Sequence, residues 1–110
     1  MVGVDAYKAL ADPTRRKILK LLRDEDLPAG VIAEQFDMSW PSVSRHLGVL
    51  TSAGLIESRR QGQQIIYSLT TSVLADIVTE LADMGRLHEA PGKGKVRREA
   101  PIPRWSVAGS

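Results

Sequence analysis

The spacing of the apolar residues changes once along this chain, and that change constrains its fold more than any other feature. Up to Gly54 the apolar residues recur every three or four positions, as they do in amphipathic helices. After Gly54, residues 55–60 and 63–69 form two extended runs on either side of Gln61-Gly62, a pattern typical of a β-hairpin. Because an isolated two-stranded hairpin is only marginally stable, it must pack on the helices. The pattern predicts a mainly helical α+β domain.

Capping residues predict where the helices begin. A first helix covers the apolar residues between positions 4 and 11. A second helix follows Asp12, whose carboxylate suits an N-cap, with Pro13 at the first helical position, where its missing N–H costs nothing. We expect Leu27-Pro28 to open a third helix.

A short polar turn, Asp37-Met38-Ser39, separates the third helix from a fourth. Ser39 caps the fourth helix, and Gly54 ends it as the residue after the C-cap. The apolar face of this helix consists of Val43, Leu47 and Leu50. Four helices, two strands and a final helix after the hairpin together predict a winged helix-turn-helix fold.

Composition excludes several classes of protein. The 110 residues contain no cysteine, so a disulfide framework, a cysteine-ligated zinc ion and a thiol nucleophile are ruled out. Asp5 and Lys8 interrupt the N-terminal region, which therefore does not read as a signal peptide, and no apolar run approaches the roughly 18 residues of a membrane span. The sequence also lacks a glycine-rich phosphate loop and a histidine beside a plausible nucleophile. We expect a cytoplasmic protein that has no membrane contact, enzymatic activity or cofactor.

The positive charge of the chain is concentrated at its C-terminal end. Residues 1–90 hold ten Lys and Arg against twelve Asp and Glu, whereas residues 91–110 hold five against one. Total basicity therefore does not by itself indicate a fold that binds nucleic acid. We divide the chain into a domain, residues 1–89, and a basic tail rich in Pro and Gly, residues 90–110.

Four segments resemble the ArsR/SmtB family of transcriptional repressors. Residues 9–19 (ALADPTRRKIL) are similar to the opening signature of the family, and residues 42–50 (SVSRHLGVL) to its recognition helix. Residues 53–56 (AGLI) resemble the exit of that helix into the wing, and residues 67–69 (YSL) the end of the second wing strand. The resemblance implies a homodimeric, sequence-specific repressor that binds double-stranded DNA. Its fourth helix would enter the major groove and its wing would reach the minor groove or the backbone. Some similar proteins control their own operon.

The outer face of the fourth helix and the hairpin tip, residues 59–63, hold the candidates for DNA contact. Arg45 lies opposite the apolar face, and its guanidinium suits the O6 and N7 atoms of guanine. Serine hydroxyls suit phosphates or base edges, and the indole of Trp40 suits a thymine methyl. The predicted DNA-binding residues are Ser39, Trp40, Ser42, Ser44, Arg45, His46, Arg59, Arg60, Gln61 and Gln63. The alternative is a solvated helix face and a solvated, charged wing tip.

Three basic residues, His46, Arg15 and Arg16, have two possible partners each. His46 lies beside the apolar face, so it contacts either a phosphate or a group inside the fold. Arg15 and Arg16 stand near a helix start, where the helix dipole disfavours positive charge. They either pair with phosphates or form ion pairs with Asp12 or Glu34.

The resemblance assigns dimerisation to the first and last helices. The last helix carries a longer apolar stripe than a monomer of this size would bury, which agrees with that assignment. The predicted interface residues are Tyr7, Leu10, Leu74, Ile77, Val78, Leu81 and Met84. An alternative function is a winged-helix module that binds another protein, and such a module would lack salt-dependent DNA binding.

Many members of the family sense metal ions, but their ligands are poorly matched in this chain. One type of site needs cysteine thiolates, which are absent. A second type uses paired carboxylates and histidines across the last helices, for which the candidates are Asp76, Asp83, His88 and Glu89, with Val78 where a histidine is needed. One histidine among surface carboxylates is a weak site for a first-row metal. We therefore predict no metal, with a metal-responsive repressor as the alternative, and the sequence identifies no effector.

Overall fold

A computed structural model describes residues 2–89 of the chain and the side chains of residues 2–86. The predicted tail, residues 90–110, lies outside the described residues. The chain divides into two compact units, one ending at Val78 and the next beginning at Thr79. The predicted helix-turn-helix and the hairpin both lie within the first unit.

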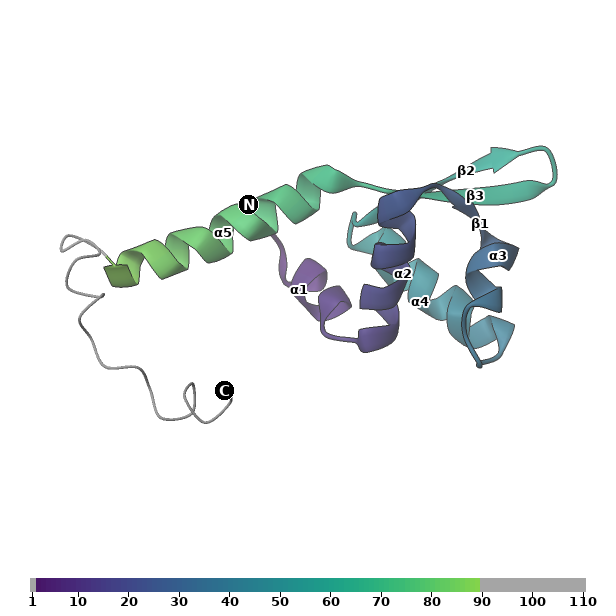
Figure 1. Cartoon of the computed structure of the whole chain (residues 1–110), viewed down its shortest axis with the longest axis horizontal. Coiled ribbons are helices and arrows are strands. Elements are labelled where there is room, and N and C mark those ends of the chain that lie inside the picture. The colour runs from purple at the N-terminus through teal and green to yellow at the C-terminus, as the bar shows by residue number, and fades with distance from the viewer. Residues whose placement is uncertain (1, 90–110) are drawn as a thin grey trace. The chain divides into compact units, whose positions relative to one another are not determined.

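The described residues form a mainly helical structure with one small antiparallel sheet (Figure 1). In chain order the elements are α1 (Val4–Leu10), α2 (Pro13–Asp24), β1 (Leu27–Pro28), α3 (Ala29–Glu34), α4 (Trp40–Ser52), β2 (Ile56–Gln61), β3 (Gln64–Leu69) and α5 (Thr71–Glu89). The strand order in the sheet is β1-β3-β2. The winged helix-turn-helix predicted from the sequence is confirmed: α3 and α4 are its two helices, and β2 and β3 form its wing.

The sheet contains one strand that the sequence did not predict. Leu27 and Pro28, expected to open the third helix, form β1 and pair with Tyr67 and Ile66 of β3. Pro28 has extended backbone angles, φ −68° and ψ 152°, and it can occupy β1 because an edge strand tolerates a residue without an N–H. The third helix therefore begins at Ala29, and β1 anchors its start to the wing.

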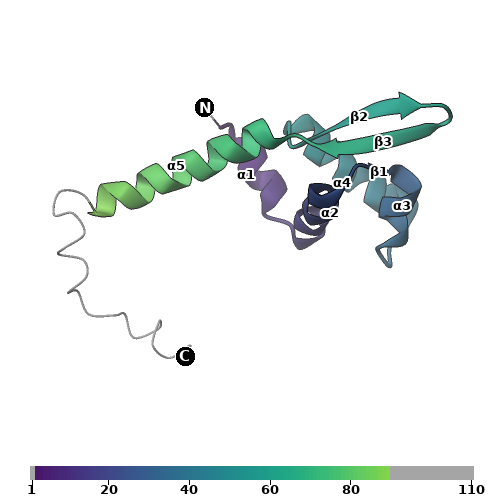
Figure 2. The same ribbon diagram turned by 45° about the horizontal axis from the view of Figure 1, so that its top comes forward.

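The turn of the wing lies one residue further along the chain than the sequence predicted, at Gly62-Gln63 instead of Gln61-Gly62. β2 and β3 remain paired as far as Gln61 and Gln64, which leaves a turn of two residues. Gly62 in this turn has a φ of +65°, which glycine adopts without a Cβ clash. Arg59 and Arg60, expected at the tip, therefore lie within β2. In both views the turn end of the hairpin extends past the neighbouring helices (Figures 1 and 2).

The predicted N-cap of α2 is confirmed, and its geometry changes the chemistry of the carboxylate. Asp12 Oδ1 accepts hydrogen bonds from the backbone N–H groups of Thr14 at 2.7 Å and Arg15 at 3.2 Å. Burial of the carboxylate raises its pKa, but the two backbone hydrogen bonds and the nearby positive charges of His46 and Arg15 lower it further than burial raises it. The pKa of Asp12 therefore lies below its usual value, and the ionised carboxylate stabilises the start of α2.

Both predicted ends of α4 are also confirmed. Ser39 accepts from the backbone N–H of Ser42, which caps the start of the helix. At the other end Gly54 follows the C-cap with a φ of +79°. Its N–H donates to the carbonyl of Thr51, and the N–H of Leu55 donates to the carbonyl of Leu50. These two bonds form a Schellman motif, which turns the chain sharply into the wing.

The core is made of aliphatic side chains from every helix and from the wing. Its buried members are Ala6, Ala9, Ile18, Leu19, Leu22, Ile32, Val43, Leu47, Leu50, Leu55, Ile56, Ile66 and Ile77. The three residues predicted for the apolar face of α4 are at most 1% exposed. This packing fixes which side of α4 faces the solvent.

Candidate nucleic-acid interface

The outer face of α4 is opposite the face that packs in the core. Ser44, Arg45 and Gly48 are exposed, whereas His46 is half-buried beside the core face. Within the described residues Arg45 makes no hydrogen bond or ion pair, so its guanidinium is available to an external acceptor. A planar guanidinium with five donors is suited to the paired acceptors of guanine or to a phosphate.

The N-terminal turn of α4 presents hydroxyl groups and an indole. Ser39 Oγ donates to Ser42 Oγ at 3.1 Å. Ser42 Oγ is therefore an acceptor in that bond, and its own O–H remains available for a phosphate or a base edge. Trp40 is 50% exposed, which is unusual for so large an apolar side chain. The predicted contacts at this end of the helix are thus all positioned at the surface.

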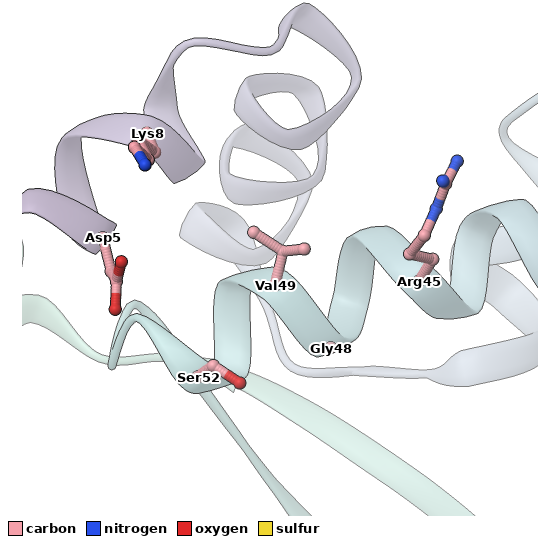
Figure 3. A pocket seen from close by; sticks show the side chains of 6 residues that line it. All are labelled: Asp5, Lys8, Arg45, Gly48, Val49 and Ser52. Carbon is pink, nitrogen blue, oxygen red and sulfur yellow. The ribbon is translucent and has the colours of Figure 1, made fainter.

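A groove separates the outer part of α4 from α1 (Figure 3). Arg45, Gly48, Val49 and Ser52 line it from α4, and Asp5 and Lys8 line it from α1. In Figure 3 the side chain of Arg45 projects away from α4, and Lys8 lies across the groove. Lys8 is not among the residues predicted from the sequence, because its proximity to α4 depends on how two distant helices pack.

The two arginines of the wing differ in their surroundings. Nη1 of Arg59 donates to Asp26 Oδ2 at 3.2 Å and to Ser68 Oγ at 3.0 Å. Within the described residues the side chain of Arg60 makes no hydrogen bond or ion pair, and Gln61 is also exposed. The guanidinium of Arg59 is therefore partly occupied by contacts within the protein, whereas that of Arg60 is available to an external acceptor. Gln63, the last of the predicted wing contacts, is exposed in the turn.

Arg15 and Arg16 donate to backbone carbonyls instead of forming the ion pairs expected for them. The Nε of Arg15 donates to the Ala9 carbonyl at 2.8 Å, and Nη1 of Arg16 donates to the Leu10 carbonyl at 2.7 Å. Cations are favourable at such carbonyls because the C-terminal end of a helix carries negative partial charge. The expected ion pairs with Asp12 and Glu34 do not form, since both guanidinium groups point to the end of α1.

His46 has the second of its two predicted partners, a group inside the fold. Its Nδ1 lies 3.1 Å from Nη1 of Arg15. Nη2 of the same arginine donates to the carbonyl of Lys8 at 3.1 Å. Arg15 thus connects α4 to α1 from its own position at the start of α2.

The predicted dimer residues are not equally accessible. Ile77 is 5% exposed and belongs to the core of the first unit, so its side chain is unavailable to a partner. Tyr7, Leu10 and Leu74 are partly buried against the same core. Val78, the last residue of the first unit, is 64% exposed.

Exposed apolar side chains continue along α5 into the second unit. Leu81 and Met84 are 52% and 54% exposed. On α1, Val4 is 67% exposed, although the sequence analysis did not select it for the interface. Large exposed apolar groups on both predicted dimer helices are the kind of surface that a partner subunit covers.

The residues considered for a metal site are only partly described. The side chains of His88 and Glu89 lie outside the described residues. Asp83 forms an ion pair with Arg86, three residues further along α5. Among the residues that the structure describes, no three His, Asp or Glu side chains gather in a group able to hold a metal ion. The absence of a regulatory metal remains a prediction. No helix among the same residues is long and apolar enough to cross a membrane.

Comparison with known proteins agrees with this architecture. A sequence family described as a helix-turn-helix domain matches residues 10–59. The chain is 53% identical over 74 residues to the transcriptional repressor SdpR of Bacillus subtilis (strain 168). The aligned region covers 67% of this chain and 82% of that protein.

Solved structures with the same fold include one described as an ArsR family regulator and one described as a homodimeric winged helix-turn-helix domain. The crystal structure of an ArsR family transcriptional regulator superposes with a TM-score of 0.75 at 30% identity, and it covers 79% of this chain and 96% of that one. The solution structure of a homodimeric winged helix-turn-helix DNA-binding domain from Mycobacterium bovis has a TM-score of 0.61 at 32% identity, over 79% and 83% of the two chains. The matched motifs, the wing and these relatives together show that the chain belongs to the ArsR/SmtB family of DNA-binding transcriptional repressors.

Proposed function

We propose that this repressor binds DNA as a homodimer and recognises an inverted-repeat operator through the outer face of α4. The observation that carries the proposal is the position of Arg45. It is exposed, it makes no hydrogen bond or ion pair with other described residues, and it lies opposite the buried Val43 and Leu47. A guanidinium held in this way on an amphipathic helix can reach a base edge in the major groove.

Contacts around Arg45 would position the helix without reading sequence. The free O–H of Ser42 and the hydroxyl of Ser44 can donate to phosphate oxygens, which fixes the orientation of α4 on the duplex. The exposed Trp40 adds an apolar surface that suits a thymine methyl. Specificity would therefore reside mainly in Arg45 and Trp40, and positioning in the serines.

The wing would supply affinity that does not depend on sequence. Arg60 is exposed and unpaired among the described residues, so it can neutralise a phosphate or enter the minor groove. Gln61 and Gln63 lie beside it and can donate to sugar or phosphate oxygens. Arg59 would contribute less, because Asp26 already neutralises part of its charge.

Dimerisation would place two copies of α4 on successive major grooves. Burying a Leu or Met side chain in an interface contributes roughly 1.5–3 kcal/mol, so Val78, Leu81 and Met84 could together hold two protomers. The relative from Mycobacterium bovis is described as homodimeric, which supports the same assembly here. Two-fold symmetry predicts half-sites with centres about 34 Å apart. This function would place the protein in the cytoplasm and requires no enzymatic activity.

Selection of binding sites from a library of random DNA duplexes tests this proposal. The full-length protein should enrich an inverted repeat with half-sites about one helical turn apart. The matched control is Leu81→Asp, which puts a charge into the proposed interface and should lose that enrichment. Enrichment of an asymmetric single site by the wild-type protein, or of no sequence, would contradict the proposal.

A further inference from the structure

One arginine connects three elements around the proposed recognition helix. Arg15 donates from Nε to the carbonyl of Ala9 at 2.8 Å and from Nη2 to the carbonyl of Lys8 at 3.1 Å, so its guanidinium covers the C-terminal end of α1. The remaining terminal nitrogen, Nη1, lies 3.1 Å from Nδ1 of His46 on α4. The three contacts hold the guanidinium in one orientation, because each uses a different nitrogen.

The contact with Arg15 determines which nitrogen of the neutral His46 ring carries the proton. An arginine side chain has five N–H donors and no acceptor, so in the neutral ring that makes this hydrogen bond Nδ1 of His46 is the acceptor and carries no proton. A neutral imidazole has one N–H, which is then on Nε2. Among the described residues, the His46 ring makes its hydrogen bond through Nδ1 and not through Nε2. The side chain is only half-buried. The Nε2–H group is thus a donor next in sequence to Arg45.

We propose that Arg15 is a positioning residue for DNA binding, which holds His46 in the tautomer that donates from Nε2 to a phosphate of the operator. The inference rests on the proposed function of α4. Phosphate oxygens carry no hydrogen and receive a large share of protein–DNA hydrogen bonds, so a neutral N–H of fixed direction matches them. The opposite tautomer would present a lone pair to the phosphate and would repel it.

The matched pair Arg15→Met and Arg16→Met separates this role from simple support of α1. Both arginines donate to carbonyls at the end of α1, and both changes remove one positive charge. Arg15 is the one of the two that contacts His46. Long-range proton–nitrogen correlation spectra of the free protein in alkaline solution report which ring nitrogen carries the proton, and they require no DNA.

We expect the wild-type and Arg16→Met proteins to show the Nε2–H tautomer of His46, and Arg15→Met to show a mixture of both tautomers. Operator binding by Arg15→Met should be about tenfold weaker than binding by Arg16→Met, as for loss of one hydrogen bond to a charged group. A proton on Nδ1 in the wild-type protein would overturn the proposal. Equal affinities of the two arginine variants would overturn it too.

Two substitutions of the histidine test the donor itself, and they decide the question even if Arg15→Met fails to fold. His46→Asn keeps a group near the Nδ1 position, but it has no donor at the distance of Nε2. His46→Gln places an amide N–H close to the Nε2 position. We expect about tenfold weaker operator binding for His46→Asn and a smaller loss for His46→Gln. Equal losses would show that the ring only supports the helix. If the wild-type protein bound no operator, the proposed function would fail, and the tautomer spectrum would distinguish that failure from a wrong assignment of the ring proton.

Discussion

The two wing arginines give a quantitative prediction, because the structure places them in different electrostatic surroundings. Arg60→Ala removes one unpaired cation from each protomer, and hence two from a dimer. The slope of log affinity against log salt concentration is negative, and each phosphate contact that is lost reduces its magnitude by about 0.9 on duplex DNA. We therefore expect the slope to flatten by about 1.8 for Arg60→Ala. Affinity should fall by similar factors on operator and random duplexes, because a phosphate contact reads no sequence.

Arg59→Ala should have a smaller effect on the same slope. Nη1 of Arg59 is 3.2 Å from Asp26, and both side chains are about half exposed, so part of its charge is already neutralised. We expect flattening by less than about 0.9, which corresponds to half of the effect of Arg60→Ala. Loss of this exposed ion pair should lower the free energy of unfolding by no more than about 1 kcal/mol.

Fluorescence anisotropy with one labelled duplex at several salt concentrations measures both slopes. Asp26→Asn provides the control, since it releases Arg59 and should increase the effect of a subsequent Arg59→Ala. Equal flattening of the slope by Arg59→Ala and Arg60→Ala in the wild-type background would show that Asp26 does not neutralise Arg59.

Three further predictions concern assembly, stability and regulation. Leu81→Asp should give a monomer or an unfolded chain, which sedimentation and circular dichroism distinguish; a wild-type monomer at micromolar concentration would contradict the dimer. Asp12→Ala should lower the free energy of unfolding by roughly 0.5–2 kcal/mol at neutral pH, whereas Asp12→Asn, which keeps the capping acceptor, should lower it less. Because the folded pKa of Asp12 lies below the usual 3.8, its charge stabilises the fold above that pH, and the stabilisation is lost as the pH falls through the folded pKa. Zinc, cadmium, nickel and arsenite should leave DNA affinity unchanged, and tenfold weaker binding with one stoichiometric metal would refute this.

The features predicted correctly from the sequence depend on interactions between residues close together in the chain. Asp12 and Ser39 cap helices through N–H groups two or three residues away. Gly54 ends α4 through backbone bonds that span three to five positions. The spacing of Val43 and Leu47 likewise fixes the core face of α4 without reference to other elements. Local rules therefore sufficed for the helix-turn-helix and for the exposed position of Arg45 on α4.

The features that were missed join residues far apart in the chain. β1 forms because Leu27 meets Tyr67 across the sheet, and neither residue carries a local signal for that pairing. Arg59 contacts Asp26, which is 33 positions away in the sequence. Arg15 meets a histidine 31 positions away, which no helical or strand periodicity could predict. These contacts depend on how the elements pack, and they decide which basic side chains remain available to DNA.

We propose that Arg45 reads a base, whereas the wing supplies affinity without sequence preference. Binding isotherms for wild type and Arg45→Ala on every single-base variant of the selected operator, at two salt concentrations, separate these two roles. We expect Arg45→Ala to lose about 1–3 kcal/mol of binding free energy on the best site and to relax the preference at one base position in each half-site. A uniform loss on all variants, with the ranking of bases unchanged, would contradict it.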